Sequence, residues 1–161
     1  MGNLLWIASY PKSGNTWMRA FIENYLQNSP RPLDINHLLQ SSTAESRADR
    51  YLAFVGDGKK TTDLTAEEIC AIRPLVHADI ARHASATVFV KTHNFLGEYK
   101  GFPLHNPSMT SGAIYIARNP LDVVISIANY FAYSLDEAIE YLGDQMARFR
   151  YLPRGFKTRH R

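Results

Sequence analysis

The amino-acid sequence predicts an α/β fold in which helices flank a central parallel sheet. Three short runs rich in apolar residues, at 4–9, 87–91 and 113–117, are typical of strands that are covered on both faces. Segments with helical signals lie between and after these runs, and strands that alternate with helices indicate parallel βαβ units. The 161 residues, of which 45% are hydrophobic and 20% charged, suffice for one ordinary domain with its own core.

The first strand and the first helix have the clearest signals. After the apolar run LLWIAS at 4–9, residues 17–26 place apolar side chains at the i, i+3, i+4 spacing of an amphipathic helix. The segment NSPRP, at 28–32, should end this helix. The pattern then weakens, and we expect only a short helix at 34–40 and a turn at 56–60.

The next helix is marked by its start signal. Thr65 and Glu68 form a capping box, which predicts a helix that runs to about His83, with Pro74 as the candidate break. It leads into the second strand. Glycine, proline and asparagine are frequent at 94–112, as in a loop.

Two more helices are predicted after the third strand. Asn119 as N-cap and Pro120 at the first helical position make a strong helix start before the apolar segment VVISIANYF. Ser134 and Glu137 form a second capping box, which predicts a helix that runs to about Arg150.

The net charge of +3 at pH 7 is unevenly distributed. Residues 147–161 carry six of the eighteen Lys and Arg residues and no acid, which leaves the rest of the chain at −3. Basic character is therefore confined to this tail, and we expect no nucleic-acid partner. No apolar run approaches the roughly 20 residues that span a bilayer, so we expect no membrane partner. The lone Cys70 and the lack of a signal-peptide pattern favour cytoplasmic localisation.

The segment YPKSGNTW, at 10–17, joins the first strand to the first helix, where open parallel sheets bind ligands. Gly14 lets the backbone approach a ligand closely, and the N–H groups of a helix start favour an anion. Lys12 adds a full positive charge, and short polar side chains come from Ser13, Asn15 and Thr16. The loop therefore predicts a phosphate or sulfate site. The alternative is a plain loop whose Ser and Thr residues cap the helix.

This loop differs from the loop that binds nucleoside triphosphates. That loop, GxxxxGK[ST], requires a lysine directly after its second glycine and before the hydroxyl residue that binds magnesium. Here Lys12 precedes Gly14, and no acidic cluster at the strand ends offers a magnesium site. A metal-dependent kinase is disfavoured, and we expect no metal.

YPKSGNTW closely resembles the 5′-phosphosulfate-binding loop of PAPS-dependent sulfotransferases, typically written YPKSGTTW, with Asn15 in place of a threonine. The segment IYIARNPLDVVISIANYF, at 114–131, resembles the 3′-phosphate-binding segment of this family, and VKTHNF, at 90–95, resembles its catalytic strand end. The resemblance covers about residues 4–146. It implies a P-loop-like three-layer fold, PAPS as sulfuryl donor and PAP as product.

The resemblance also implies roles for individual residues. Arg118 and Ser126 would hold the 3′-phosphate, and Trp17 would stack on the adenine. The 5′ end of the donor would be held by Lys12, Ser13, Gly14, Asn15 and Thr16. Two alternatives remain: Trp17 could be a core residue of its helix, and Ser126 could bond back to its own helical turn.

For the catalytic step, the resemblance implies that Lys12 and Lys91 stabilise the charge on the leaving phosphate. His93 would take the proton from the acceptor hydroxyl, for which an unperturbed pKa near neutral pH suits histidine. Taken by itself, His93 would be an ordinary loop histidine. We expect the other histidines to be surface groups, namely His37, His77, His83, His105 and His160.

The sequence thus predicts a PAPS-binding domain at 1–146 and a basic tail of uncertain origin at 147–161. The third donor-binding segment of the family, which is glycine-rich with an Arg-Lys-Gly signature, has no counterpart here. We therefore expect a truncated, frame-shifted or short divergent member, whose incomplete sheet favours a homo-oligomer.

The predicted activity is transfer of a sulfuryl group from PAPS to a small-molecule alcohol, phenol or amine. The first alternative is an inactive remnant that binds PAP or PAPS without turnover. The second is a nucleic-acid binder that uses the basic tail.

Overall fold

The computed structural model describes residues 3–34, 42–56 and 58–144. The chain divides into two compact units, with the boundary between Ala117 and Arg118. Each unit is described by itself below.

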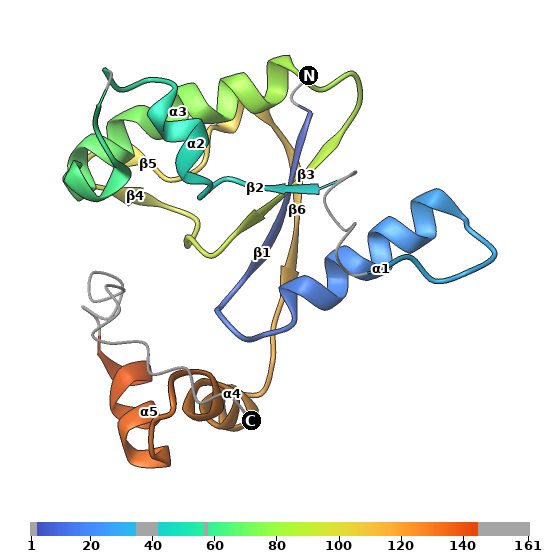
Figure 1. The fold of residues 1–161 in the computed structure, drawn as a ribbon, viewed down its shortest axis with the longest axis vertical. Helices are drawn as coiled ribbons and strands as arrows, with labels where there is room; N and C mark the ends of the chain where they lie inside the picture. Colours follow the sequence, from blue (N-terminus) through green and yellow to red (C-terminus); the bar gives the residue numbers. More distant parts are fainter. Residues whose placement is uncertain (1–2, 35–41, 57, 145–161) are drawn as a thin grey trace. The chain divides into compact units, whose positions relative to one another are not determined.

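The first unit is built on a four-stranded sheet in which all neighbouring strands are parallel (Figure 1). The strand order is β2-β3-β1-β6, so the two central strands, β3 and β1, come from distant parts of the sequence. The bounds are Leu4–Ser9 for β1, Ser42–Ala44 for β2, Val88–Thr92 for β3 and Thr110–Ile116 for β6. Parallel pairing brings the carboxyl ends of all four strands to one edge of the sheet, where open α/β sheets bind ligands.

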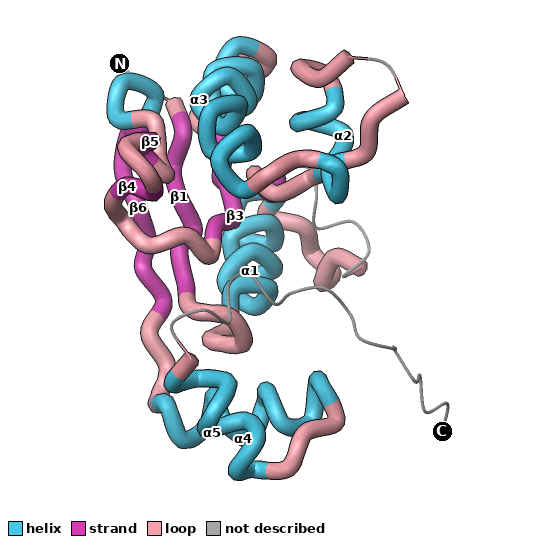
Figure 2. The backbone as a smooth tube through the Cα atoms, turned by 90° about the vertical axis from the view of Figure 1, so that its left-hand side faces the viewer, coloured by secondary structure: helices cyan, strands magenta, loops and turns pink. Residues whose placement is uncertain are grey.

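Helices pack beside this sheet, as Figure 2 shows for the helices α1 and α3 next to the strands. The helices of the first unit are α1 at Asn15–Gln27, α2 at Ala48–Leu52 and α3 at Ala66–Arg82. The α/β fold with a parallel central sheet flanked by helices is therefore confirmed. Among the described helices, none is long and apolar enough to cross a membrane.

The core of the first unit lies between the central strands and α3. Trp6 and Val90 contribute from β1 and β3, Val76 and Ile80 from α3, and Tyr51 from α2. All five side chains are almost completely buried, and burial of apolar surface stabilises the fold by roughly 25 cal/mol per Å². The core therefore joins both central strands to the helices that follow β2.

The second unit consists of two helices, α4 at Pro120–Phe131 and α5 at Leu135–Gly143. The Asn119 side chain caps α4 by accepting a hydrogen bond from the Leu121 amide at 3.1 Å. Ser134 and Glu137 form the predicted capping box of α5. The two helices share a small core of Val123, Ile127, Ala128 and Ala138.

Most predicted elements are confirmed, with shifts of one to three residues at their ends. The capping box at Thr65 and Glu68 opens α3 as predicted. Pro74 was wrongly considered a break, because α3 runs through it without interruption. The predicted loop at 94–112 is wrong in part. It contains a short antiparallel hairpin, β4 at Glu98–Tyr99 and β5 at Phe102–Pro103, a 3-10 turn, and the first residues of β6.

The strand β2 and the helix α2 were not predicted either. The helix predicted to run to about Arg150 is shorter than expected, because α5 ends at Gly143 and the backbone is extended at Asp144. Two predictions fall wholly or partly outside the described residues, namely the short helix at 34–40 and the basic tail at 147–161. The turn predicted at 56–60 includes Gly58, whose φ of 81° is typical of a turn glycine.

Candidate active site

The loop between β1 and α1 has a left-handed backbone at two positions, Lys12 with φ of 67° and Gly14 with φ of 110°. A side chain at Gly14 would meet only an ordinary contact at 4.0 Å, so the backbone conformation, rather than space, requires glycine there. The amide of Ser13 donates to the carbonyl oxygen of Tyr10 at 3.2 Å, which closes the turn.

Gly14 is also the N-cap of α1, and it supplies no side-chain hydrogen bond to the helix start. The amide of Met18 makes the first helical bond, to the Gly14 carbonyl oxygen at 3.1 Å. The backbone amides that precede Met18 in the first turn have no hydrogen-bond acceptor within the helix. Amides in this position attract an anion, as the sequence motif predicts.

Asn15 is buried at the first position of α1. Its side-chain amide donates to the carbonyl oxygen of Ile7 at 2.8 Å and to Oγ of Ser9 at 3.2 Å. Its Oδ1 atom is buried and has no hydrogen-bond partner among the described residues. Both side-chain donors are thus engaged by β1, and the residue ties the loop to the end of that strand.

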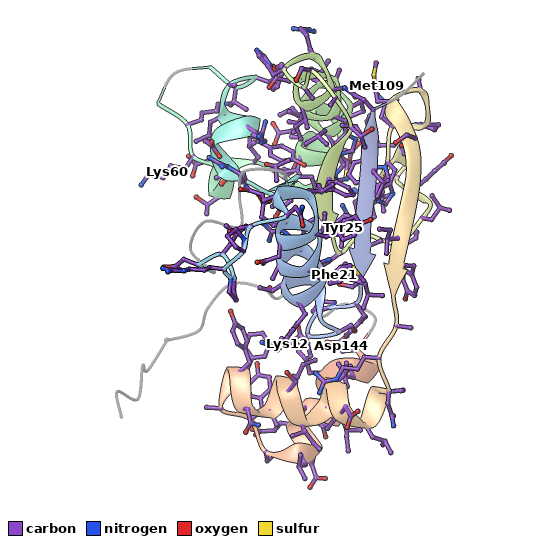
Figure 3. All side chains as sticks on the ribbon, turned by 90° about the vertical axis from the view of Figure 1, so that its right-hand side faces the viewer. Lys12, Phe21, Tyr25, Lys60, Met109 and Asp144 are labelled. Carbon is purple, nitrogen blue, oxygen red and sulfur yellow. The ribbon has the colours of Figure 1, made fainter. Side chains whose placement is uncertain are left out.

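Trp17 and Thr16 follow on the exposed surface of α1. Trp17 is 82% exposed, so it is not a core residue of its helix in the described structure. Lys12 lies at the end where α1 begins, and Phe21 and Tyr25 follow along the helix (Figure 3). An exposed indole next to the predicted anion site is free of the core packing that would prevent stacking on a ligand ring.

His93 directly follows β3, and its ring contacts the end of the neighbouring strand β1. Its Nδ1 atom lies 2.8 Å from the carbonyl oxygen of Ser9, so the Nδ1–H group donates to that oxygen. In the neutral imidazole this bond fixes the tautomer and leaves the lone pair on Nε2. The neutral form of His93 can therefore accept a proton at Nε2.

The surroundings lower the pKa of His93 below its ordinary value. Partial removal of the ring from water is the main cause, and the positive charge of Lys91 adds to it. The Ser9 carbonyl oxygen and the more distant Glu45 carboxylate oppose the shift. The imidazole is consequently neutral at pH 7, which is the form that a general base requires.

Cations gather beside the loop. Burial lowers the pKa of Lys91 on β3, and the nearby charges of Arg19 and Lys12 lower it further. Like charges within interaction range are costly unless an anion compensates them, so this grouping favours an anionic ligand. The Nε–H group of Arg19 donates to Oγ of Ser42 at 3.0 Å, which links α1 to the start of β2.

Arg19 was missed in the sequence analysis. Its signal is its place on α1, four residues after Asn15 and thus one turn further along the helix. A cation at that place adds positive charge near the predicted anion site at the helix start.

Two histidines expected at the surface are buried, and that expectation was wrong. His77 on α3 has no exposed surface, and His105 is 9% exposed. Trp6 makes edge contacts with both rings, with centroids 4.8 Å from His77 and 4.7 Å from His105. Nε2 of His77 lies 2.8 Å from Oε2 of Glu45, and this buried partner explains why a polar ring is tolerated in the core.

His83 is exposed, as expected, and its Nδ1 atom lies 3.2 Å from a carboxylate oxygen of Asp79. His37 and His160 lie outside the described residues.

The two residues expected at the 3′-phosphate belong to the second unit. Arg118 is exposed immediately before the N-cap of α4, and Ser126 is half-buried within that helix. The first unit holds the other expected site residues, and it brings Lys12, Asn15, Lys91 and His93 to the carboxyl edge of the β1–β3 pair.

Among the described residues, no three His, Cys, Asp or Glu side chains gather as a metal site would require. None of the curated proteins compared with the chain matches it. A family model described as "Sulfotransferase domain" matches residues 3–150, which is nearly the whole chain. The chain therefore belongs to the sulfotransferase domain family, whose members transfer sulfuryl groups.

Proposed function

We propose that this protein transfers a sulfuryl group from PAPS to a hydroxyl or amine of a small-molecule acceptor, with PAP as the second product. The observation that carries the proposal is the hydrogen bond from Nδ1 of His93 to the Ser9 carbonyl oxygen at 2.8 Å. It orients a neutral imidazole at the strand edge next to the anion-binding loop. Family membership supports sulfuryl transfer in general.

His93 acts as the general base in this proposal. Its Nε2 atom accepts the proton of the acceptor hydroxyl or amine while the acceptor oxygen or nitrogen forms a bond to sulfur. The bond between sulfur and the bridging phosphate oxygen breaks, and its electron pair stays on that oxygen. General-base catalysis of this kind typically contributes about 10²–10⁴-fold to the rate.

Lys12 and Lys91 stabilise the negative charge that develops on the leaving phosphate oxygen. Sulfuryl transfer resembles loose phosphoryl transfer, so catalysis rests mainly on positioning and on fixed positive charge. Burial is the main cause of the lowered pKa of Lys91, and the positive charges of Arg19 and Lys12 lower it further; bound phosphosulfate would compensate these charges.

The remaining donor contacts follow from the motifs. The backbone amides of the loop and the side chains of Ser13 and Thr16 hold the 5′-phosphosulfate, and Trp17 stacks on the adenine. Arg118 and Ser126 hold the 3′-phosphate, for which a guanidinium offers two parallel hydrogen bonds. Asn15 contributes through its backbone and through the bonds that fix the loop to β1. These residues lie within the proposed donor-binding domain at 1–146.

Calorimetric titration with PAP tests the donor site. We expect saturable binding by the wild-type chain, weakened about tenfold or more by Lys12→Ala and by Arg118→Ala because each removes a charge-assisted phosphate contact. A folded wild-type chain that does not bind PAP would contradict the proposal. Binding without turnover on any alcohol, phenol or amine would instead identify a donor-binding protein without catalytic activity.

A further inference from the structure

A second polar cluster lies beside the candidate active site, at the carboxyl end of β2. Glu45 directly follows β2, and its backbone amide donates to the Lys91 carbonyl oxygen of β3 at 3.3 Å. Its side chain is buried, and its Oε1 atom accepts a hydrogen bond from the side-chain amide of Asn94, the residue after His93. Glu45 therefore lies at the same sheet edge as His93.

The Glu45 carboxylate is shared by two further partners. Its Oε2 atom lies 2.8 Å from Nε2 of His77, and its Oε1 atom lies 3.9 Å from Nε of Arg73. Nδ1 of His77 is buried and has no hydrogen-bond partner among the described residues, so Nε2 makes the contact of this ring with Glu45. The cluster thus joins a buried carboxylate, a buried guanidinium and a buried imidazole.

Arg73 is the partner with unmet hydrogen-bonding capacity. It is 8% exposed, and its Nε–H group is buried without a hydrogen-bond partner among the described residues. Its Nη1 atom donates to the sulfur of Cys70 at 3.2 Å, and sulfur is a weak acceptor. A distance of 3.9 Å to Glu45 is too long for a hydrogen bond.

A cavity of about 200 Å³ opens beside this cluster. Polar residues line the cavity together with the apolar residues Ala48 and Ile69. The polar lining residues are Glu45, Ser46, Tyr51, Thr61, Arg73 and Asn94. The volume is below the roughly 300–1,000 Å³ of pockets for drug-sized ligands, so the cavity fits one ring or a comparable fragment.

The charges of the lining limit what can occupy the cavity. An anionic fragment would be repelled by the Glu45 carboxylate, and a cationic fragment would be repelled by the Arg73 guanidinium. The lining therefore disfavours a charged fragment of either sign. A hydroxyl group can donate to Glu45 and accept from Arg73 at the same time. Burial raises the pKa of Tyr51 to about 12, so its phenol also stays neutral and able to donate and accept.

We infer that this cavity binds a small uncharged polyhydroxy fragment of the sulfuryl acceptor, such as a sugar ring. Asn94 and Glu45 both line the cavity and are hydrogen-bonded to each other, and Asn94 directly follows His93 in the chain. In this inference the bound ring presents another hydroxyl of the same acceptor to His93. That the bound ring belongs to the sulfuryl acceptor rests on the proposed function. That the cavity binds an uncharged polyhydroxy ring does not.

Direct binding of three probes with the same ring tests the inference without any turnover. Methyl β-glucoside is uncharged, glucosamine is cationic and glucuronate is anionic at neutral pH. Affinities are measured by ligand-detected NMR on the full chain, with and without saturating PAP. We expect methyl β-glucoside to bind at least about tenfold more tightly than either charged ring, because each charged ring meets one like charge in the cavity.

Two charge-removing variants should reverse these preferences in opposite directions. Glu45→Gln removes the negative charge, so glucuronate should gain relative to methyl β-glucoside. Arg73→Met removes the positive charge, so glucosamine should gain. A charged ring that binds more tightly than methyl β-glucoside to the wild-type chain would overturn the inference.

A third variant keeps the test decisive if the buried variants fail to fold. Ala48 is an exposed residue at the start of α2 that lines the cavity, so Ala48→Leu narrows the cavity without touching the buried cluster. We expect it to weaken methyl β-glucoside binding about tenfold and to leave PAP affinity unchanged. Ala66→Leu, at the exposed start of α3 outside the cavity lining, is the matched control.

The outcomes separate the two proposals. If PAP binds and none of the rings does, or if Ala48→Leu leaves ring binding unchanged, the cavity inference is wrong and the proposed donor site stands. If the neutral ring binds as expected and PAP does not, the proposed function fails and the cavity remains a binding site for an uncharged polyol.

Discussion

Nδ1 of His93 lies 2.8 Å from the carbonyl oxygen of Ser9. Ser9 is the last residue of β1, and it orients the imidazole of the residue that directly follows β3. A backbone carbonyl oxygen is an acceptor only, and it cannot be removed by a side-chain substitution. The tautomer of His93 is consequently fixed by the pairing of β1 with β3 rather than by a particular side chain.

Replacing His93 by alanine should abolish most of the turnover and spare the donor site. We expect kcat to fall about 10²–10⁴-fold, because the general base is lost, while the affinity for PAP stays within about twofold. Steady-state kinetics and calorimetric titration measure the two quantities. His83→Ala, at the exposed end of α3, is the matched control and should change neither. An equal loss of PAP affinity in His93→Ala would show that the residue acts in binding.

The pH profile of kcat/KM should report the lowered pKa of His93. The value of kcat/KM should rise with pH as the imidazole loses its proton and then reach a plateau. The midpoint of this rise should lie below 6.5, the unperturbed pKa of histidine. Since Lys91 contributes to the lowering, Lys91→Ala should move this midpoint upward even though it also reduces the rate. A midpoint above 6.5 in the wild-type enzyme would contradict the assignment.

The same pKa shift predicts the sign of a stability change. Between the lowered folded value and the unfolded value near 6.5, the unfolded chain binds more protons at His93 than the folded chain does. The contribution of His93 to the free energy of unfolding therefore falls as the pH drops through this window and is constant above it. Urea denaturation across pH 5–8, compared between the wild-type chain and His93→Gln, measures that contribution.

Asn15→Ala should destabilise the chain by about 1–3 kcal/mol, because it removes the buried hydrogen bonds to the Ile7 carbonyl oxygen and to Oγ of Ser9. The affinity for PAP should fall as well, since the loop loses its tie to β1. Denaturant unfolding and PAP titration measure the two effects. Thr16→Ala, at the next and exposed position, should leave stability within about 0.5 kcal/mol. If Asn15→Ala and Thr16→Ala were equally stable, the hydrogen bonds from Asn15 to β1 would not stabilise the loop.

Glu45→Ala should cost about 3–5 kcal/mol of stability, because it removes one partner of a buried polar cluster and strands Arg73 without its countercharge. The comparison is Glu67→Ala, which breaks an ion pair with Lys100 in which both side chains are more than half exposed. That exposed pair should contribute only about 0–1 kcal/mol. Similar costs for the two variants would show that the Glu45 cluster contributes little to the fold.

The order of the strands also bears on self-association. In the described part of the chain, β2 and β6 are the edge strands of the sheet. An uncovered edge offers unpaired backbone groups to a second chain, so we predict a homo-oligomer at micromolar concentration. Light scattering measures the mass, and a monodisperse monomer would count against this prediction.

The elements predicted correctly from the sequence are those with local signals. The capping boxes at Thr65 and Ser134 and the cap at Asn119 depend on neighbours three or fewer residues away, and all three are present. The strand β2 has only the residues Ser-Thr-Ala and no apolar pattern. It exists because it pairs with β3, and a partner that is distant in the sequence leaves no local trace.

The candidate site divides in the same way. The loop at Lys12 and Gly14 and the position of His93 follow from motifs that are contiguous in the sequence. The burial of His77 does not, because its partner Glu45 is 32 residues away and no spacing rule connects the two. Asn15 is an intermediate case. The motif predicts its position in the loop, but the sequence does not predict that its side chain donates to Ile7 and Ser9 of β1.

The separation of Ser9 and His93 by 84 residues has a consequence for the order in which this protein folds. Contacts between residues so far apart require the closure of a long loop, and such contacts form late and slowly. During synthesis, the loop between β1 and α1 emerges long before the strand that His93 follows. A nascent chain that ends before β3 therefore has the loop sequence but no oriented imidazole, and the contact between Ser9 and His93 forms only when the central strands join.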